Sequence, residues 1–255
     1  MSEQVVAAPV FSDGEQVAVR LEGFPTSIAF STLKAGNVSI RWETVPGEAQ
    51  KSLAQLLGIL DFCLPKRVHM IPAHADEVVV VGGESPEDTN GDILITTERG
   101  VALSLFPGDC FPVVITDTCG TVLSLVHAGW RGTDLEVARL AVEFMATQME
   151  VDPSNLVAAI GPGIRSCCYT AKTRIQHLQQ NESWKPFLPD LSRIDLPGYL
   201  QYQLIIAGVH SDHVFDLGLC TYCATDRKGQ PMFFSNIRAG DTGEVEGRFA
   251  AIAML

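Results

Sequence analysis

Apolar residues along this chain occur mainly in short alternating or continuous runs, which is the pattern of strands rather than long helices. Runs predicted as strands lie at 17–21, 27–32, 38–42, near Val68, and at 78–81, 93–96, 101–106, 112–116, 121–126, 157–160, 232–235 and 249–254. Residues 34–37 have the composition of a turn between the second and third runs. Four runs between 93 and 126 follow one another without a helix. We therefore expect a sheet built largely of hairpins rather than a βαβ array.

Helical periodicity marks fewer segments. The face formed by Leu53, Leu56, Leu57 and Leu60 predicts a helix over 48–60. Thr133 and Glu136 have the spacing of a capping box, which predicts a helix start there. That helix would bury Val137, Leu140, Ala141, Phe144, Met145 and Met149. Later helices are expected within 171–180 and 200–208, and 82–91 is expected to be a loop. An α+β fold with two layers of sheet, helices outside, and one domain over 1–255 fits this order best.

Composition limits the classes of function. With 255 residues, 46% of them hydrophobic, the chain can bury the core of an enzyme-sized unit. No apolar run is long enough for a membrane span and no secretion signal is recognisable, so we expect a cytoplasmic protein without a membrane partner. Seven cysteines, an odd number, indicate reduced thiols. A net charge of -12 argues against a nucleic-acid partner, so an anionic substrate must be held by a few arginines and backbone amides.

The segment from His127 to Thr133 is the strongest chemical signal in the chain. It follows a predicted strand and precedes a predicted helix, so it gathers an imidazole, a guanidinium and a helix start, which are the parts of an anion site. Cys110 lies just before the preceding strand, and a hairpin turn at 117–120 would bring it near His127. With His74, these residues match a catalytic zinc set of three ligands. Taken singly, His74 is more often a surface histidine and Cys110 a structural thiol.

The ordered motifs resemble those of the laccase-domain or polyphenol oxidase family of PgeF-like proteins, also described as purine nucleoside phosphorylases. The resemblance covers most of the chain from about Phe30 onward. It is carried by Gly108-Asp109-Cys110-Phe111-Pro112, His127-Ala128-Gly129-Trp130-Arg131-Gly132-Thr133, Ile160-Gly161-Pro162-Gly163-Ile164 leading to Cys167-Cys168-Tyr169, Cys220-Thr221, and Phe233-Phe234-Ser235.

The resemblance implies both a reaction and an architecture. It implies zinc bound by His74, Cys110 and His127, and phosphorolysis of adenosine, inosine and methylthioadenosine, with adenosine deamination alongside. The implied partners are therefore a small nucleoside and phosphate, and we expect a monomer or weak homodimer. The implied fold is a four-layer αββα sandwich of mixed sheets, similar to that of bacterial cysteine-hydrolase toxins.

Three positions depart from the family pattern. Pro72 and Ala73 replace the usual Gln-Val before the first histidine, which is kept. Leu33 stands where the family commonly has an arginine, which puts phosphorolysis in doubt if that arginine holds phosphate. Lys34 is a partial substitute, because lysine is a point charge without the bidentate fork. The Phe-Ser-Tyr-Arg-Arg-like segment keeps only Arg238 of its two arginines.

Roles for the remaining site residues stay open at this point. Arg131, together with backbone amides at the Thr133 helix start, is the candidate for holding phosphate. The alternative is a purely structural arginine that forms a salt bridge beneath the sheet. Asp109 is expected to orient a histidine or to carry a proton, the former favoured. Trp130 is expected to stack on a base or to plug the core under the loop.

Three other functions compete with zinc-dependent nucleoside chemistry. Cys110 can be a nucleophile activated by His127 in an amidase or other hydrolase acting on peptidoglycan precursors, and metal content discriminates because a zinc-bound thiolate is a poor nucleophile. A four-copper oxidase needs about ten histidines, many in H-x-H pairs. This chain has six histidines and no such pair, so multicopper laccase activity is not expected. A non-catalytic binding module leaves the ligand types unexplained.

The other cysteine and histidine pairs carry weaker signals. Cys220 and Cys223 form a single C-x-x-C, which is weak evidence for a metal or redox site, and packing is the default for Cys167 and Cys168. His210 and His213 lack a third candidate ligand.

Overall fold

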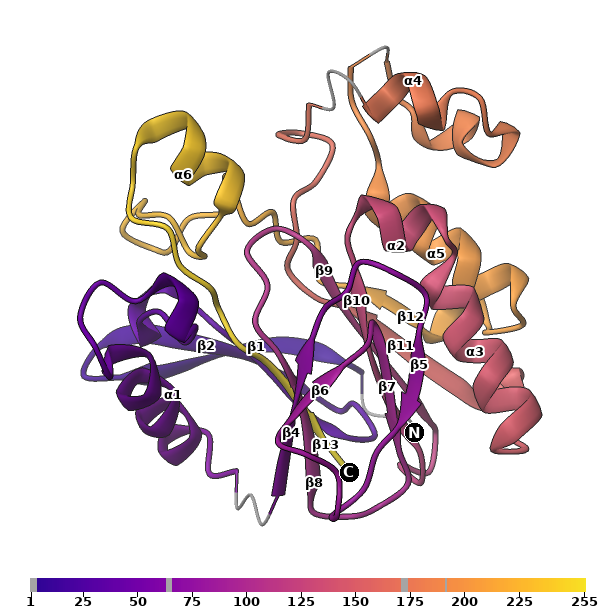
Figure 1. The fold of residues 1–255 in the computed structure, drawn as a ribbon, viewed down its shortest axis with the longest axis horizontal. Helices are drawn as coiled ribbons and strands as arrows, with labels where there is room; N and C mark the ends of the chain where they lie inside the picture. Colours follow the sequence, from indigo (N-terminus) through magenta and orange to yellow (C-terminus); the bar gives the residue numbers. More distant parts are fainter. Residues whose placement is uncertain (1–3, 63–65, 171–173, 191) are drawn as a thin grey trace.

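The computed structural model describes residues 4–62, 66–170, 174–190 and 192–255 (Figure 1). In this part of the chain the strands form two mixed sheets. The larger has the order β1 (Val6–Ser12), β2 (Glu15–Glu22), β3 (Ser27–Ser31), β13 (Ala251–Met254), β8 (Val101–Leu105), β4 (Lys66–Ile71) and β6 (Asp88–Asn90). The smaller has the order β12 (Val214–Asp216), β11 (Leu156–Ile160), β9 (Phe111–Asp117), β10 (Leu123–Ala128), β7 (Ile93–Thr96) and β5 (Val78–Val80).

Helices lie outside the two sheets. They are α1 (Glu48–Ile59), α2 (Trp130–Asp134), α3 (Val137–Gln148), α4 (Arg174–Leu178), α5 (Leu196–Ile206) and α6 (Asn236–Thr242). Short 3-10 turns cover Leu33–Ala35, Ile40–Trp42, Pro153–Asn155, Glu182–Phe187 and Ser211–His213. Among the helices described, none has the length and apolar character needed to cross a membrane.

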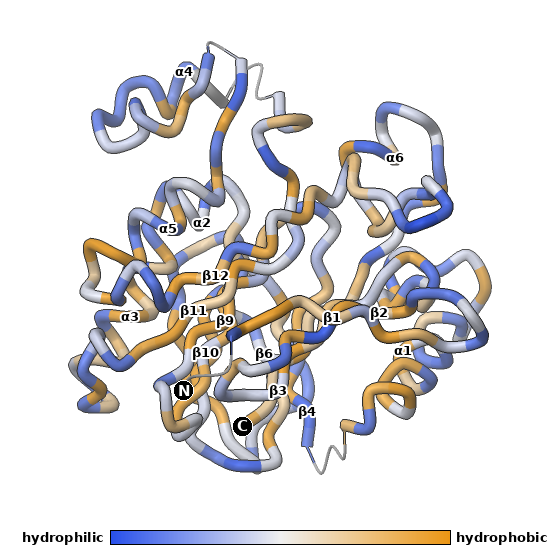
Figure 2. Tube along the Cα trace, turned by 180° about the vertical axis from the view of Figure 1, so that it is seen from behind, coloured by the Kyte–Doolittle hydropathy of each residue, from blue (hydrophilic) through white to orange (hydrophobic). Residues whose placement is uncertain are grey.

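The apolar core has three parts. One cluster joins the facing sides of the two sheets, with Phe30 and Leu103 from the larger and Val114 and Leu125 from the smaller. A second lies between α1 and the larger sheet. A third packs α3 and α5 on the smaller sheet, whose central strands β9, β10 and β11 are buried along their whole length. In Figure 2 the central strands of the smaller sheet are mostly orange, whereas α4 is mostly blue. Burial on both faces explains why these strands have continuous apolar runs.

The predicted α+β class with two sheets is confirmed, whereas the four-layer sandwich and its likeness to hydrolase toxins stay predictions. The expectation of hairpins holds for part of the fold, because β9 and β10 pair in an antiparallel hairpin. It fails elsewhere, since β4 pairs in parallel with β6 and β8, and β5 and β11 also have parallel neighbours. The segment 82–91, predicted as a loop, contributes β6.

Two predicted strands and one predicted helix start are wrong. Residues 38–42 end in a 3-10 turn, because the Asn37 side chain bonds to both the N–H and the C=O of Ser39 in place of a strand ladder. Residues 232–235 lead instead into α6, whose first turn Ser235 caps by accepting from the Arg238 N–H. The capping box at Thr133 does not form, because its hydroxyl donates to the Gly129 C=O inside α2. The strand β1 is not predicted at all.

Candidate metal centre and its pocket

Three candidate metal ligands meet where the chain crosses from one sheet to the other. His74 lies on the connection from β4 to β5, and Cys110 lies on the connection from β8 to β9. His127 is in β10, opposite Pro112 of β9, so the hairpin register sets it beside Cys110. The ligand atoms of the three residues lie within 4.8 Å of one another, and the two imidazole rings are 4.8 Å apart. The predicted convergence of all three is therefore present in the structure.

Asp92 fixes the orientation of this group, and sequence reasoning missed it. Its fully buried carboxylate accepts from His127 Nδ1 at 2.8 Å. It also accepts from the backbone N–H groups of Ala73, His74 and Ala75 at 3.2, 3.1 and 2.8 Å. These bonds hold the loop in which His74 has a φ of 59°, a left-handed value unusual for a side chain other than glycine. With Nδ1 of His127 occupied by Asp92, Nε2 is left for a metal.

The hydrogen bonds of Asp109 do not lead to a histidine, contrary to the favoured expectation. Its Oδ1 accepts from the hydroxyls of Thr221 and Ser235, both at 2.7 Å, and its Oδ2 accepts from the Ile237 N–H at 2.8 Å. The carboxylate that orients a histidine is thus Asp92, not Asp109. Burial raises the pKa of Asp109, and the bonds from Ser235 and Thr221 offset this only in part. Asp109 ties the loop before Cys110 to two segments near the C-terminus.

The electrostatics of the ligands favour a charged thiolate. Burial alone would raise the pKa of Cys110, but the charge on His127 and hydrogen bonds from both histidines outweigh it and lower the pKa to about 6. Burial likewise disfavours the charged form of His127, but the Cys110 thiolate and the bond to Asp92 raise its pKa to about 9. Thiolate is the form in which cysteine binds metals or attacks a substrate.

The segment from His127 to Thr133 is built around the Cys110 sulfur. A Cβ at Gly129 would lie 2.8 Å from the Cys110 Sγ, so only glycine leaves room for the sulfur. The helix α2 starts at Trp130, with Gly129 as its N-cap, three residues earlier than predicted. Thr133 is fully buried and its hydroxyl is used within α2, so the structure does not bring it to the substrate side.

A pocket of about 510 Å³ opens beside the three ligands and is lined by cationic and aromatic side chains. Arg131 lines it as predicted and is exposed, with its guanidinium 4.8 Å from the ring of Trp130, which also lines the pocket. This placement rules out the salt bridge beneath the sheet. Arg41 and Arg248 also line it and stack on Trp42 at 5.4 and 4.5 Å. Neither was predicted, because each is an isolated arginine in sequence.

Lys34 and the retained Arg238 both have clear structural contexts. Lys34 lies 3.8 Å from Glu15, and neither it nor Leu33 is among the residues that line this pocket. Arg238 is buried and donates to the C=O groups of Thr221, Tyr222 and Phe233, so it serves the C-terminal loops rather than the pocket. Arg41, Arg131 and Arg248 are the arginines that line the pocket, and Arg248 is also paired with Glu246 at 3.0 Å.

The donor set fits a zinc ion. One thiolate and two imidazoles are nitrogen and sulfur ligands that zinc accepts, and three protein ligands leave the fourth tetrahedral position open to the pocket. The carboxylate behind His127 is the partner that metal-binding histidines usually have.

Comparison with known proteins places the chain in a family. A family model described as multi-copper polyphenol oxidoreductase laccase matches residues 22–255. The chain belongs to this family. The purine nucleoside phosphorylase LACC1 of Mus musculus is 28% identical over 75% of this chain and 44% of its own length. The purine nucleoside phosphorylase YlmD of Geobacillus stearothermophilus is 35% identical over 60% of this chain and 57% of its own length. The chain thus matches about half the length of these two relatives.

A third relative and a solved structure extend the comparison. The adenosine deaminase RL5, from an unknown prokaryotic organism, is 27% identical over 76% of both chains. The crystal structure of YlmD from Geobacillus stearothermophilus superposes with a TM-score of 0.81 over 97% of this chain and 99% of that one, at 26% identity. The α+β fold is therefore shared with a family member, and relatives of this chain are named for reactions on nucleosides.

Proposed function

We propose that this protein is a zinc-dependent purine nucleoside phosphorylase that also deaminates adenosine at the same site. The observation that carries the proposal is the placement of His74, Cys110 and His127 at one side of a pocket with cationic and aromatic walls. The names of the relatives support the same substrate class. The proposed substrates are adenosine, inosine and methylthioadenosine, with phosphate as the second substrate.

We assign different roles in phosphorolysis to different residues of the pocket. In this reaction a phosphate oxygen bonds to C1′ of the ribose as the C1′–N9 bond breaks, and the electron pair passes to the purine, which takes up a proton. Arg131 and Arg41 supply charge for the phosphate, and their guanidinium forks match its oxygens. The guanidinium of Arg248 donates to Glu246 and to the Gly247 C=O, so it lines the pocket without a free fork. Trp130 and Trp42 offer aromatic faces to the base.

The metal ligands are His74, Cys110 and His127. When bound, zinc would supply Lewis-acid polarisation to a phosphate oxygen or to the water that attacks C6 of adenine. Asp92 holds His127 in one tautomer and keeps the His74 loop in place through its backbone bonds. We assign Asp109 to positioning the loop before Cys110, because its carboxylate is engaged with Thr221, Ser235 and Ile237.

One observation favours a second candidate function. Asp92, His127 and Cys110 are arranged as the acid, base and nucleophile of a cysteine hydrolase, with the Cys110 pKa lowered to about 6. An amidase acting on peptidoglycan precursors would use that set. His74 has no part in such a triad, whereas it completes a metal site, so we rank the zinc function first.

The test combines metal analysis with nucleoside turnover. Purified protein is analysed for zinc and assayed on adenosine and inosine with and without phosphate, beside His127→Ala and the control His210→Ala. His210 is an exposed histidine outside the pocket lining. We expect phosphate-dependent release of free base by the wild type and the control. His127→Ala should lose turnover together with the zinc of this site.

Two results would contradict the proposal. Full turnover by a wild-type protein free of metal would remove zinc from the mechanism. A metal-free protein that is inert on nucleosides would instead direct attention to Cys110 as a nucleophile and to cell-wall peptides as substrates.

A further inference from the structure

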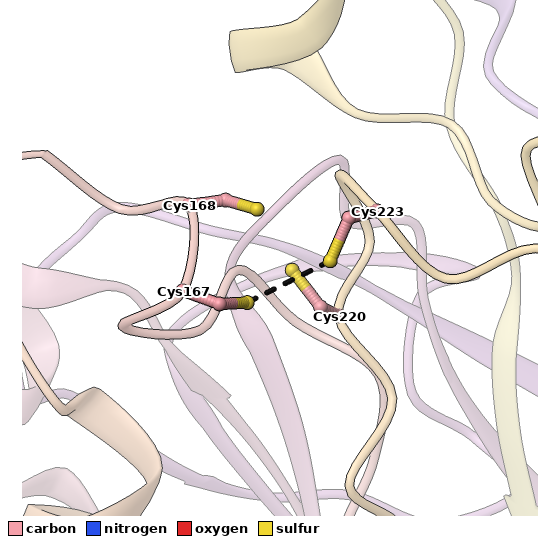
Figure 3. A group of neighbouring side chains, drawn as sticks. All are labelled: Cys167, Cys168, Cys220 and Cys223. Atoms are coloured by element: carbon pink, nitrogen blue, oxygen red, sulfur yellow. Dashed lines mark hydrogen bonds between the residues drawn. The ribbon is translucent and has the colours of Figure 1, made fainter.

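Four cysteines outside the pocket meet at one point between two loops (Figure 3). Cys167 and Cys168 lie on the loop after β11, and Cys220 and Cys223 lie on the loop after β12. All four sulfur atoms lie within 4.8 Å of one another, and the Sγ atoms of Cys167 and Cys223 are 3.6 Å apart. Figure 3 shows the four side chains pointing from both loops toward a common space.

The backbone builds this convergence. The strands β11 and β12 are parallel neighbours, so the loops that follow them leave the same edge of the sheet. Beyond the strands the pairing continues, because Gly163 N donates to the Leu219 C=O at 3.2 Å and Thr221 N donates to the Gly163 C=O at 3.1 Å. The Ala224 N–H bonds to the Cys220 C=O at 2.9 Å, which closes a turn around the C-x-x-C. The cysteines are thus held together by elements far apart in sequence.

We propose that Cys167, Cys168, Cys220 and Cys223 bind a second zinc ion, as a closed structural site. A zinc–sulfur distance of about 2.3 Å in a tetrahedron places the sulfurs about 3.8 Å apart. The separations in the cluster are compatible with that requirement, so a metal needs only small side-chain movements. A ligand set made only of thiolates selects zinc among the common divalent ions. Four protein ligands leave no open position, so this site differs in kind from the one in the pocket.

Oxidation to a disulfide is the competing explanation. Cys167 and Cys223 would have to close from 3.6 Å to about 2.05 Å, and a single disulfide would leave Cys168 and Cys220 without a role. A zinc ion uses all four thiols. It would also protect Cys167 and Cys223, which are exposed to solvent and would otherwise be open to oxidation.

The second zinc would brace one wall of the pocket. Thr221 lies within the C-x-x-C and donates to Asp109, the residue next to Cys110, at 2.7 Å. On the other loop, the Ile164 N–H donates to the Asp109 C=O at 2.8 Å, and Tyr169, which follows Cys168, lines the pocket. Joining the two loops through four sulfurs therefore fixes both sides of the segment that carries Cys110. This inference concerns other residues than the proposed function and does not depend on it.

Counting zinc ions in defined variants tests the proposal. Protein is purified in reducing buffer without chelators, and zinc is measured per chain in the wild type, Cys223→Ser, Cys167→Ser, His127→Ala and Cys119→Ser. Cys119 is an exposed cysteine outside the cluster and is the matched control. We expect Cys223→Ser and Cys167→Ser each to contain one zinc ion fewer per chain than the wild type and the control, and His127→Ala to keep the zinc of the cluster, whether or not the pocket also holds zinc. Cobalt substitution should give intense thiolate-to-metal charge-transfer bands that persist in His127→Ala and fall in Cys223→Ser to no more than the band of the single Cys110 thiolate.

Three results would overturn the proposal. The first is a wild-type protein with one zinc ion that Cys223→Ser and Cys167→Ser both retain and His127→Ala loses. The second is a wild-type mass lower by two hydrogens under native, non-reducing conditions, which would indicate a disulfide. The third is iron instead of zinc with a coloured chromophore, which would indicate an iron–sulfur cluster. Nucleoside turnover decides none of these results, so failure here is separate from failure of the proposed function.

Discussion

Replacing Asp92 by asparagine should weaken zinc binding in the pocket without altering any ligand. Asp92 is fully buried, and each of its oxygens accepts two hydrogen bonds. An asparagine of the same shape has one oxygen and one NH₂ group. In either orientation the NH₂ group therefore faces two buried donors that had bonded to a carboxylate oxygen, and both lose their acceptor. Each of these two unsatisfied buried groups costs about 1–3 kcal/mol, so the free energy of unfolding should fall by about 2–6 kcal/mol. Losing the partner of a metal-binding histidine should lower zinc affinity by about 10- to 100-fold.

The assay is a competition between the protein and a chromogenic zinc chelator, made in the Cys223→Ser background so that only the pocket site contributes. Urea unfolding of the same variants gives the change in stability. Asp117→Asn is the control, because Asp117 is also a buried aspartate and accepts three bonds from its own turn, from the Thr121 N–H and hydroxyl and the Val122 N–H. It should lose stability and keep its zinc affinity. Wild-type zinc affinity in Asp92→Asn, or equal weakening in the control, would refute the reasoning.

Three further predictions concern stability and are measured by urea unfolding. Burial and Arg67 lower the pKa of His69 from 6.5 to about 4, so the folded state resists the proton that the unfolded chain accepts, and stability is lost as the pH falls through this range. Between about pH 7 and about pH 4.5 this loss amounts to about 2 kcal/mol, and His69→Gln should show a correspondingly smaller decrease; an unchanged pH profile would contradict it. Gly163→Ala should lower the free energy of unfolding by about 1–3 kcal/mol, because the new Cβ would lie 2.5 Å from the Phe111 ring. Gly240→Ala, with open space around it, should cause no such loss, and equal effects of the two changes would disprove the packing argument. Arg238→Met should lower the free energy of unfolding by about 3 kcal/mol, because three backbone carbonyls lose their donor. A free energy of unfolding within about 0.5 kcal/mol of wild type, the size of an ordinary surface change, would count against this prediction.

The convergence of the candidate metal ligands could be predicted from the sequence because two of them flank one hairpin. Once β9 and β10 are recognised as neighbours, Cys110 and His127 must lie at the same end of the pair. Asp92 could not be predicted in this way. It is a single aspartate 35 residues before His127 in sequence, and it reaches that residue only because β7 pairs with the other side of β10. The role of Asp92 becomes visible only when the order of the strands in the sheet is known, because no local sequence pattern marks it.

Local signals also failed where a side chain competed with the backbone. The alternation at 38–42 is typical of a strand, but Asn37 satisfies the Ser39 backbone by itself and leaves Ile40 exposed. Thr133 and Glu136 have the right spacing for a helix cap, yet the Thr133 hydroxyl donates back to Gly129. The cysteine pairs are visible in sequence, but their convergence depends on the parallel pairing of β11 and β12, which apolar periodicity does not specify.

The position of the three candidate ligands beside strands of the smaller sheet has a consequence for folding. His74 precedes β5, Cys110 precedes β9 and His127 is in β10, while Asp92, just before β7, holds the His74 loop. Until these strands have paired, a nascent chain can offer a metal only one or two of the three ligands. A zinc ion bound at the proposed site would favour the paired strands by mass action, stabilising them by RT ln(1 + [Zn]/Kd). Metal occupancy in the pocket would thus be a record of a completed smaller sheet, and a chelator should loosen the ends of these strands before it affects the larger sheet.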